Sequence, residues 1–219
     1  VKAADADAEI ETYGVVNSIT DHRTFFIEDA TGAVAVYDSE EAGLVDDVEV
    51  GDKLYITGVK GAYNGLQQIT EADLTVVSSG NDLKDPVNLN DATLSDDEAM
   101  MDHLGLRANF NHAEITAISE DQYGNIDVSL ESIYSGETID VRYDSRLADS
   151  ESDATHLLTF STGDIVNISA MTIGWYNGAQ LLYTSEDEVA DAGVTADSVD
   201  TVLGTATGED VTVRGVVTN

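Results

Sequence analysis

Few side chains in this sequence could act as nucleophiles or hold a transition metal. The chain has no cysteine, which excludes disulfides, thiolate metal sites and cysteine nucleophiles. Its four histidines, His22, His103, His112 and His156, do not have the spacing of a two-histidine zinc motif. The nucleophile-elbow, phosphate-loop and dinucleotide motifs do not occur in the sequence either. We therefore expect no catalytic constellation in this segment, so that any active site would belong to another part of a longer protein.

Clusters of acidic residues could bind calcium, which prefers carboxylate oxygens. None of them has the spaced ligands and the glycine of an EF-hand loop, and a solvated acidic surface is the competing interpretation. No other cofactor is expected. The clusters are Asp5-Ala-Asp7, Asp46-Asp47, Asp96-Asp97-Glu98, Asp149-Ser-Glu-Ser-Asp153 and Glu186-Asp187-Glu188.

The charge balance is strongly acidic, with 43 Asp and Glu against 9 Lys and Arg and a formal net charge of −34. Such self-repulsion is tolerable in high salt, where the Debye length falls to about 3 Å at 1 M, or at an extracellular surface rich in divalent cations. An acidic domain from an ordinary mesophile is the alternative. The same charge disfavours a nucleic-acid partner, because affinity for phosphates depends on Lys and Arg. No apolar run approaches the roughly 20 residues of a membrane span, so membrane insertion is not expected.

The sequence repeats itself over a long distance. Val50-Gly51-Asp52 followed by Tyr63-Asn64-Gly65 recurs as Thr162-Gly163-Asp164 followed by Tyr176-Asn177-Gly178. The Gly-Asp pairs are one residue closer together than the Tyr-Asn-Gly triplets, so the copies differ by one small insertion or deletion. A repeat of roughly 110 residues is longer than a solenoid unit and matches a whole small domain. Two tandem copies of one domain are therefore predicted.

Alternating apolar and polar residues predict half-buried antiparallel strands in both copies. Three strands precede a helix-compatible stretch in each copy, and two strands follow it. In the first copy the strands are predicted at 10–19, 23–29, 33–37, 53–60 and 66–77, the last broken near Glu71, with a short helix at 39–45. In the second copy they are predicted at 108–119, 126–132, 137–143, 165–173 and 180–184, with a helix within 145–158.

Helical and strand signals also occur outside the two copies. Ser95, followed three residues later by Glu98, forms a capping box and predicts a short helix over 96–104, and 195–203 could be its counterpart. Asp210 to Asn219 echoes the start of the first copy and is expected to be the first strand of a truncated third copy. The predicted units are a first domain at 1–80, a linker at 81–104, a second domain at 105–193, and a further linker with the third-copy strand at 194–219.

Three strands, a short helix and two more strands are the order of the OB-fold, a five-stranded Greek-key barrel. The predicted fold is therefore all-β, with two tandem OB-fold-like barrels joined by a short helical linker. The first copy resembles the YhcR-type OB-fold repeats attached to secreted bacterial nucleases and related surface proteins. The residues that carry this resemblance are Gly14-Val-Val16, Phe25-Phe-Ile-Glu-Asp29, Thr31-Gly32, Val36-Tyr37, Val50-Gly-Asp52, Ile56-Thr-Gly58, Tyr63-Asn-Gly65 and Gln67.

The second copy keeps part of this pattern, including Gly163-Asp164 and Tyr176-Asn-Gly178, but has Asp127-Val-Ser-Leu-Glu131 where the first copy has Phe-Ile-Glu-Asp. Because the shared motifs are mostly structural, the resemblance implies a fold more than an activity. It also implies an extracellular or cell-surface location within a larger protein. The other domains of that protein are then the first partners of this segment.

OB-folds bind ligands across their second and third strands, beneath the loops between strands one and two and between strands four and five. Aromatic side chains beside a few cations on that face are what single-strand binding uses. The candidate ligand residues are Arg23, Phe26, Tyr37, Lys60, Tyr63 and Asn64 in the first copy, and Arg142, Tyr143, Trp175, Tyr176 and Asn177 in the second.

The Tyr-Asn-Gly triplets also have a structural interpretation as an alternative to ligand binding, because Asn-Gly readily adopts the positive φ of a tight hairpin turn. The leading functional hypothesis is a non-catalytic accessory segment of a larger secreted or surface protein, associated with a nuclease domain. Binding of single-stranded nucleic acid or oligosaccharide by the OB faces is the first alternative. A calcium-dependent adhesive spacer is the second.

Overall fold

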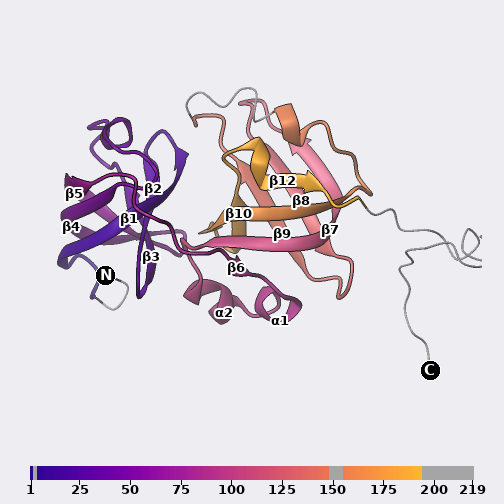
Figure 1. Ribbon diagram of the computed structural model, residues 1–219, viewed down its shortest axis with the longest axis horizontal. Helices are drawn as coiled ribbons and strands as arrows, with labels where there is room; N and C mark the ends of the chain where they lie inside the picture. Colours follow the sequence, from indigo (N-terminus) through magenta and orange to yellow (C-terminus); the bar gives the residue numbers. More distant parts are fainter. Residues whose placement is uncertain (2–3, 148–154, 194–219) are drawn as a thin grey trace, which may run out of the picture.

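The computed structural model describes residues 1, 4–147 and 155–193, which form two β-barrels joined by a helical connection (Figure 1). The first barrel is closed in the order β1-β2-β3-β5-β4. β3 and β5 run parallel and the other neighbours run antiparallel, so two hairpins are completed by one crossover. Its strands are β1 (Glu9–Asp21), β2 (Thr24–Asp29), β3 (Gly32–Tyr37), β4 (Lys53–Tyr63) and β5 (Leu66–Ser78).

The second barrel repeats this topology. β9 pairs in parallel with β11, and β10 pairs with β7 to close the barrel. Two short strands extend its sheet: β12 (Val189–Asp191) beside β10 and β6 (Val87–Asn88) beside β7. The prediction of two tandem OB-type barrels is confirmed. The repeated strands are β7 (Arg107–Glu120), β8 (Ile126–Ser132), β9 (Thr138–Tyr143), β10 (Ile165–Trp175) and β11 (Ala179–Leu182).

The helical segments differ from the sequence predictions. Instead of a helix over 39–45, the chain wraps around the Asp38 carboxylate, which accepts the N–H groups of Ala42, Gly43 and Leu44 before a 3₁₀ turn, η1 (Leu44–Asp47). The linker has two short helices, α1 (Asp91–Leu94) and α2 (Asp97–Asp102), and η2 (Glu186–Glu188) precedes β12.

The capping residue in the linker also differs from the prediction. Asp96, and not Ser95, caps α2, because its carboxylate accepts the N–H groups of Glu98 and Ala99. Residues 148–154 of the helix predicted within 145–158 lie outside the described residues, as do the predicted helix at 195–203 and the third-copy strand at 210–219. No helix in the described ranges is long and apolar enough to cross a bilayer.

The two Gly-Asp pairs make the same contacts in the two barrels. The Gly51 N–H donates to the Val16 carbonyl and the Asp52 carbonyl accepts from Val16, while Gly163 and Asp164 bond Ile115 in the same way. Each aspartate carboxylate also accepts the N–H three residues earlier in the chain. The glycines have φ values of +94° and +97°, a conformation that favours glycine. The duplicated sequence therefore encodes a duplicated turn that binds the first strand of each barrel.

The pairing of β7 with β10 has two irregularities, and β7 has one residue more than β10 between the Val166–Ala113 and Ile168–Phe110 pairs. Ile168 pairs with Phe110 and Met171 with Ala108, so β10 has one residue more than β7 between these pairs. Ala170 has a φ of 57° at this bulge. β1 and β4 pair without interruption at the corresponding place. In the first barrel, β5 is one strand through Glu71, but its pairing with β4 shifts by one residue between the Thr57–Asp73 and Val59–Thr70 pairs, where a break was predicted and where Glu71 has a φ of 50°.

Each barrel has its own apolar core, formed by the inward-facing side chains of alternating strand positions. Phe25, Ile27, Leu54 and Ile56 fill the first barrel. The second core is larger because helix α2 and the β11 strand region add side chains to it, including Met100 and Tyr183. Removing such side chains from water stabilises each barrel by about 1.5–3 kcal/mol per residue.

We predict that Gly163→Ala lowers the free energy of unfolding by about 1–2 kcal/mol, because a Cβ is disfavoured at this positive φ. A Cβ at this position would meet no atom within 4 Å, so the loss would come from the backbone conformation and not from a clash. Urea denaturation followed by Trp175 fluorescence would measure the change. Gly178→Ala is the control: it also meets no atom but has no positive φ, and its effect should stay within about 0.5 kcal/mol.

Candidate functional site

The outer face of β2 in the first barrel, where a ligand was expected, lies against the connection that leads into the second barrel. Phe26 is 0% exposed. A Cβ placed on Gly105 would come within 3.0 Å of both the Phe26 ring and the Ala33 side chain. The expectation that Phe26 faces a ligand is therefore wrong, because backbone from the connection before β7 already covers this ring.

The same junction contains buried polar side chains that are hydrogen-bonded across it. The Asn17 side-chain amide donates to the Gly105 carbonyl (2.8 Å) and to Glu28 Oε2 (3.0 Å). Glu28 Oε1 accepts the backbone N–H of Lys84 at 2.7 Å. Further along, the Thr172 hydroxyl donates to Ser18 Oγ at 2.7 Å. The junction thus joins β1 and β2 of the first barrel to the linker and to β10.

The two Tyr-Asn-Gly hairpins meet at this junction. The Asn177 N–H donates to the Asn64 carbonyl at 3.1 Å, and the Trp175 indole lies so close to Gly65 that a Cβ there would be 2.4 Å from Nε1. Asn64, Gly65 and Asn177 all have positive φ, as the turn interpretation predicted. The Tyr63 and Tyr176 rings lie side by side, with centroids 6.3 Å apart.

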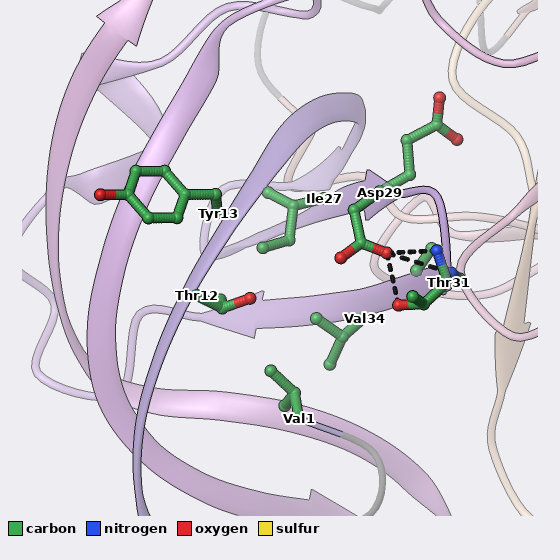
Figure 2. A pocket seen from close by; sticks show the side chains of 10 residues that line it. Val1, Thr12, Tyr13, Ile27, Asp29, Thr31 and Val34 are labelled. Atoms are coloured by element: carbon green, nitrogen blue, oxygen red, sulfur yellow. Dashed lines mark hydrogen bonds between the residues drawn. The ribbon is translucent and has the colours of Figure 1, made fainter.

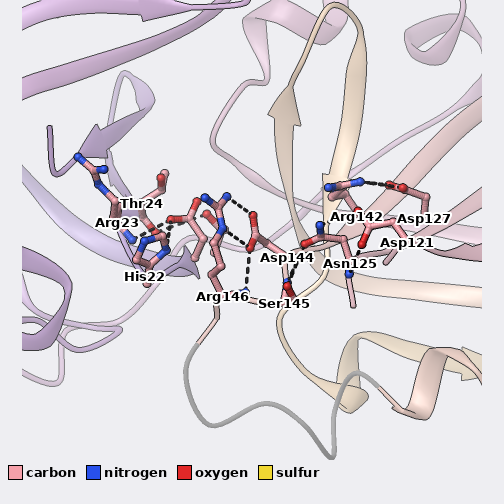
Figure 3. A network of polar contacts seen from close by, with 12 residues as sticks. His22, Arg23, Thr24, Asp121, Asn125, Asp127, Arg142, Asp144, Ser145 and Arg146 are labelled. Atoms are coloured by element: carbon pink, nitrogen blue, oxygen red, sulfur yellow. Dashed lines mark hydrogen bonds and ion pairs between the residues drawn. The ribbon is translucent and has the colours of Figure 1, made fainter. Parts of the chain in front are cut away.

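A group of basic residues bridges the barrels at another part of the junction (Figure 3). The Arg23 guanidinium lies over the Tyr37 ring, with Cζ 4.8 Å from the ring centroid. Its Nε donates to the Asp38 carbonyl and its Nη1 pairs with Glu41 at 2.9 Å. Arg23 and Tyr37, two of the predicted ligand residues, are therefore in contact with each other.

Arg142 and Arg146 of the second barrel are paired with carboxylates. Arg146 makes a two-pronged contact with Asp144, with Nε–Oδ1 at 2.8 Å and Nη2–Oδ2 at 2.6 Å. This hydrogen bond, together with the charges of Asp144 and Asp21 and the nearby Tyr37, raises the pKa of Arg146 despite the opposing effect of burial. Arg142 donates through Nη1 to both oxygens of Asp127. A phosphate would have to compete with these carboxylates for the guanidinium groups.

The corresponding face of the second barrel is polar. The strand pairing makes Ser129 the counterpart of Phe26 and Asp140 the counterpart of Ala35. Ser129 donates to Asp140 Oδ1 at 2.8 Å, and Arg142 takes the position of Tyr37. This face therefore offers carboxylates and hydroxyls but no aromatic ring.

Two more of the predicted ligand residues are buried. Tyr143 belongs to the core of the second barrel, where its ring makes an edge contact with Tyr183 at 6.2 Å. Lys60 is buried and its Nζ donates to the Ala4 carbonyl at 2.6 Å. Both were expected to face a ligand, and both expectations are wrong. Trp175 is half-buried against Gly65, whereas Tyr63 and Tyr176 remain exposed.

A hollow on the first barrel opens between β1 and the β2–β3 turn (Figure 2). Thr12, Tyr13 and Ile27 lie on its walls, and Asp29 lies at its rim. Burial would raise the pKa of Asp29, but the hydroxyl and N–H of Thr31 and the N–H of Gly32 lower it further than burial raises it. These bonds hold the turn, so Asp29 is a structural residue.

Among the residues that the structure describes, the histidines and acidic clusters make no recognisable centre; the predicted cluster Asp149-Ser-Glu-Ser-Asp153 lies outside the described residues. His103 Nδ1 lies 2.7 Å from the Ala99 carbonyl and His156 Nε2 lies 3.0 Å from the Val189 carbonyl, so both rings contact backbone. Within residues 1, 4–147 and 155–193, no three His, Asp or Glu side chains are close enough to hold a metal ion.

Sequence reasoning missed Asn17, Glu28, Gly105 and Arg146. Glu28 belongs to the Phe-Ile-Glu-Asp segment that carries the family resemblance, so this signal could have singled it out. The sequence does not indicate, however, which part of the chain covers it. Arg146 lies after β9, in a stretch interpreted as an insert. Nothing in its local sequence pattern indicates contact with the first barrel.

No family model matches the sequence, and no curated protein matches it. A murine DNA-binding protein solved with double-stranded DNA is similar in structure, with a TM-score of 0.40, 11% identity, and coverage of 83% of this chain and 96% of that one. The Ifi202 HINa domain in complex with 20-bp double-stranded DNA has a TM-score of 0.37 and 10% identity, with 82% and 93% covered.

The replication protein A heterotrimer bound to single-stranded DNA is a further similar structure. Its TM-score is 0.38 at 10% identity, with 93% of this chain and 53% of that chain covered. These are similarities to nucleic-acid-binding proteins at very low identity, and they do not assign a ligand to this chain.

We predict that Asn17→Ala lowers the free energy of unfolding by about 1–3 kcal/mol, because it removes the donor shared by Glu28 and Gly105 and leaves the buried carboxylate with fewer partners. Thr116→Ala is the matched control. Thr116 is the counterpart of Asn17, since it follows Ile115 as Asn17 follows Val16, but it is exposed. Its removal should change stability by no more than about 0.5 kcal/mol. Equal losses in the two variants would contradict this account of the junction.

The Asp144–Arg146 pair predicts a pH dependence. Burial raises the pKa of Asp144, but the Arg146 side chain and N–H lower it below its ordinary 3.8 overall. The ionised carboxylate thus stabilises the fold above pH 3.8, and this contribution is lost as the pH falls through the lower folded-state pKa. Stability of Asp144→Asn, measured by urea denaturation from pH 5 downward, should fall less steeply than that of the wild type. A pH dependence of Asp144→Asn as steep as that of the wild type would contradict this account of the pair.

Proposed function

We propose that this chain is a non-catalytic tandem OB-fold segment of a larger secreted or cell-surface protein, in which it accompanies a nuclease domain. The YhcR-type motifs of the first copy support this assignment. In this role the two barrels act as one accessory unit that positions neighbouring parts of the parent protein.

The observation that carries the proposal is the accessibility and the composition of the OB face of each barrel. In the first barrel, Phe26 and Ala35 are 0% exposed. In the second barrel their counterparts are Ser129 and Asp140, which cannot stack on a base. One face is thus used to hold the barrels together, and the other is acidic where a nucleic-acid face is normally basic.

Several carboxylates accept backbone hydrogen bonds that hold turns in place, which also supports a non-catalytic role. The Asp38, Asp52 and Asp164 carboxylates each accept backbone N–H groups in turns. The Asp121 carboxylate likewise accepts the N–H groups of Tyr123 and Asn125. Such carboxylates hold loops in place and are not free to transfer protons.

A second candidate function is the binding of single-stranded nucleic acid at the basic group of Figure 3. Arg23 stacked on Tyr37 combines a cation with an aromatic ring, and Arg146 approaches from the other barrel. Single-strand sites use this combination. The carboxylates already paired with both arginines weigh against it.

Fluorescence anisotropy with a labelled single-stranded oligonucleotide separates the two candidates. The accessory role predicts a Kd weaker than about 0.1 mM at physiological salt, because so few cations are free to bind phosphates. It also predicts no cleavage of the oligonucleotide when calcium or magnesium is added. Tighter, salt-sensitive binding that is lost in Arg23→Ala and in Tyr37→Ala would establish the second candidate. Leu158→Ala, at an exposed position, controls for general effects of substitution.

A further inference from the structure

We propose that the paired Tyr63 and Tyr176 rings form a binding site for a neutral oligosaccharide. The site goes beyond the accessory role proposed above and lies apart from the arginine group. It exists only when both barrels are in place, because each barrel supplies one of the two rings.

Both rings are largely exposed to solvent, although the turns that carry them contact each other. Tyr63 is 61% and Tyr176 58% exposed, with centroids 6.3 Å apart and planes inclined by 48°. The hairpins beneath them are fixed to each other by the Asn177–Asn64 backbone bond and by Trp175 lying on Gly65. Leu66, next to the first turn, packs against the core of the second barrel. The rings are thus presented on a preformed support, which lowers the entropy cost of binding.

The chain segments that form the two turns carry no charged residue, although 24% of the residues of the chain are charged. No charged residue occurs between Lys60 and Glu71 or between Asp164 and Glu186. Both hairpins instead contain carboxamides, Asn64 and Gln67 in one and Asn177 and Gln180 in the other. The site therefore combines aromatic faces with neutral hydrogen-bonding groups.

This combination matches the chemistry of a sugar ring. The negative face of a tyrosine ring attracts the C–H edge of a pyranose, and carboxamides both donate to and accept from hydroxyl groups. A neutral sugar is not repelled by the net charge of −34, whereas a phosphate backbone is, and no Lys or Arg within 61–70 or 165–185 offsets that repulsion. The observations therefore favour a neutral glycan over nucleic acid at this position.

The chain contains one tryptophan, Trp175, which lies beneath the site and can report on it. We would titrate the whole chain with chitohexaose, with cellohexaose and with a single-stranded oligothymidylate, following Trp175 emission at sugar concentrations up to the millimolar range. A saturable change with at least one sugar is expected. Tyr63→Ala and Tyr176→Ala should each weaken it by about three- to tenfold, and Tyr63→Phe should retain it.

Tyr13→Ala is the matched control. Tyr13 is 53% exposed and also pairs with a second tyrosine, Tyr55, at 5.0 Å, but Glu11 hydrogen-bonds that tyrosine. This variant should bind as the wild type does, and circular dichroism would verify that all variants are folded. A response to the oligothymidylate alone, no response to either sugar, or an equal loss in Tyr13→Ala would overturn the proposal. A response to the oligothymidylate would also be expected in the anisotropy test, whereas the results with the sugars leave the outcome of that test open, so the two proposals can fail separately.

Discussion

The Asn17 side chain holds the two barrels in one arrangement, because its single amide group bonds partners on both sides of the junction. It donates to Glu28 within the first barrel and to the Gly105 carbonyl in the connection to the second. Glu28 in turn accepts the N–H of Lys84 in the linker. A buried carboxylate is costly unless it is well hydrogen-bonded, so the linker must follow the surface of the first barrel closely. The close approach of Gly105 to Phe26, the contact of the two hairpins and the position of Arg146 all depend on that path.

The two copies form the same barrel, but the outer face of the barrel has a different role in each copy. The Gly-Asp turns and the strand order are conserved between the copies because they close each barrel. On the outer face, Phe26, Ala33 and Ala35 correspond to Ser129, Thr138 and Asp140. Apolar and small residues stand where the face is covered, and polar residues stand where it meets solvent, as the cost of exposing or burying each type requires. Duplication has thus produced one barrel that carries a junction and one that presents an acidic surface.

Strand positions were predictable because alternation of apolar residues follows directly from the two-residue period of a strand. Ile126 to Ser132 was predicted with the bounds that β8 has, and the Tyr-Asn-Gly turns adopt the positive φ that Asn-Gly favours. The helix over 39–45 was wrong because Asp38 binds three successive N–H groups and competes with helix formation. The site was only partly predictable. Alternation correctly placed Phe26 on the outside of its barrel, but period alone cannot tell a solvent-facing side chain from one covered by a distant segment.

The sequence by itself determined the duplication, the five-strand order of each copy and the turns that close them, because each of these follows from local periodicity and from residues with special backbone preferences. The tertiary structure alone decided which outward residues remain accessible. Phe26 and Lys60 are buried, and Tyr143 belongs to the core of the second barrel. Tyr63 and Tyr176, which are far apart in the chain, lie side by side and exposed to solvent. The physical reason is that accessibility depends on contacts between segments far apart in the sequence. These contacts arise within one barrel for Lys60 and Tyr143, and between the first barrel and the rest of the chain for Phe26 and the tyrosine pair.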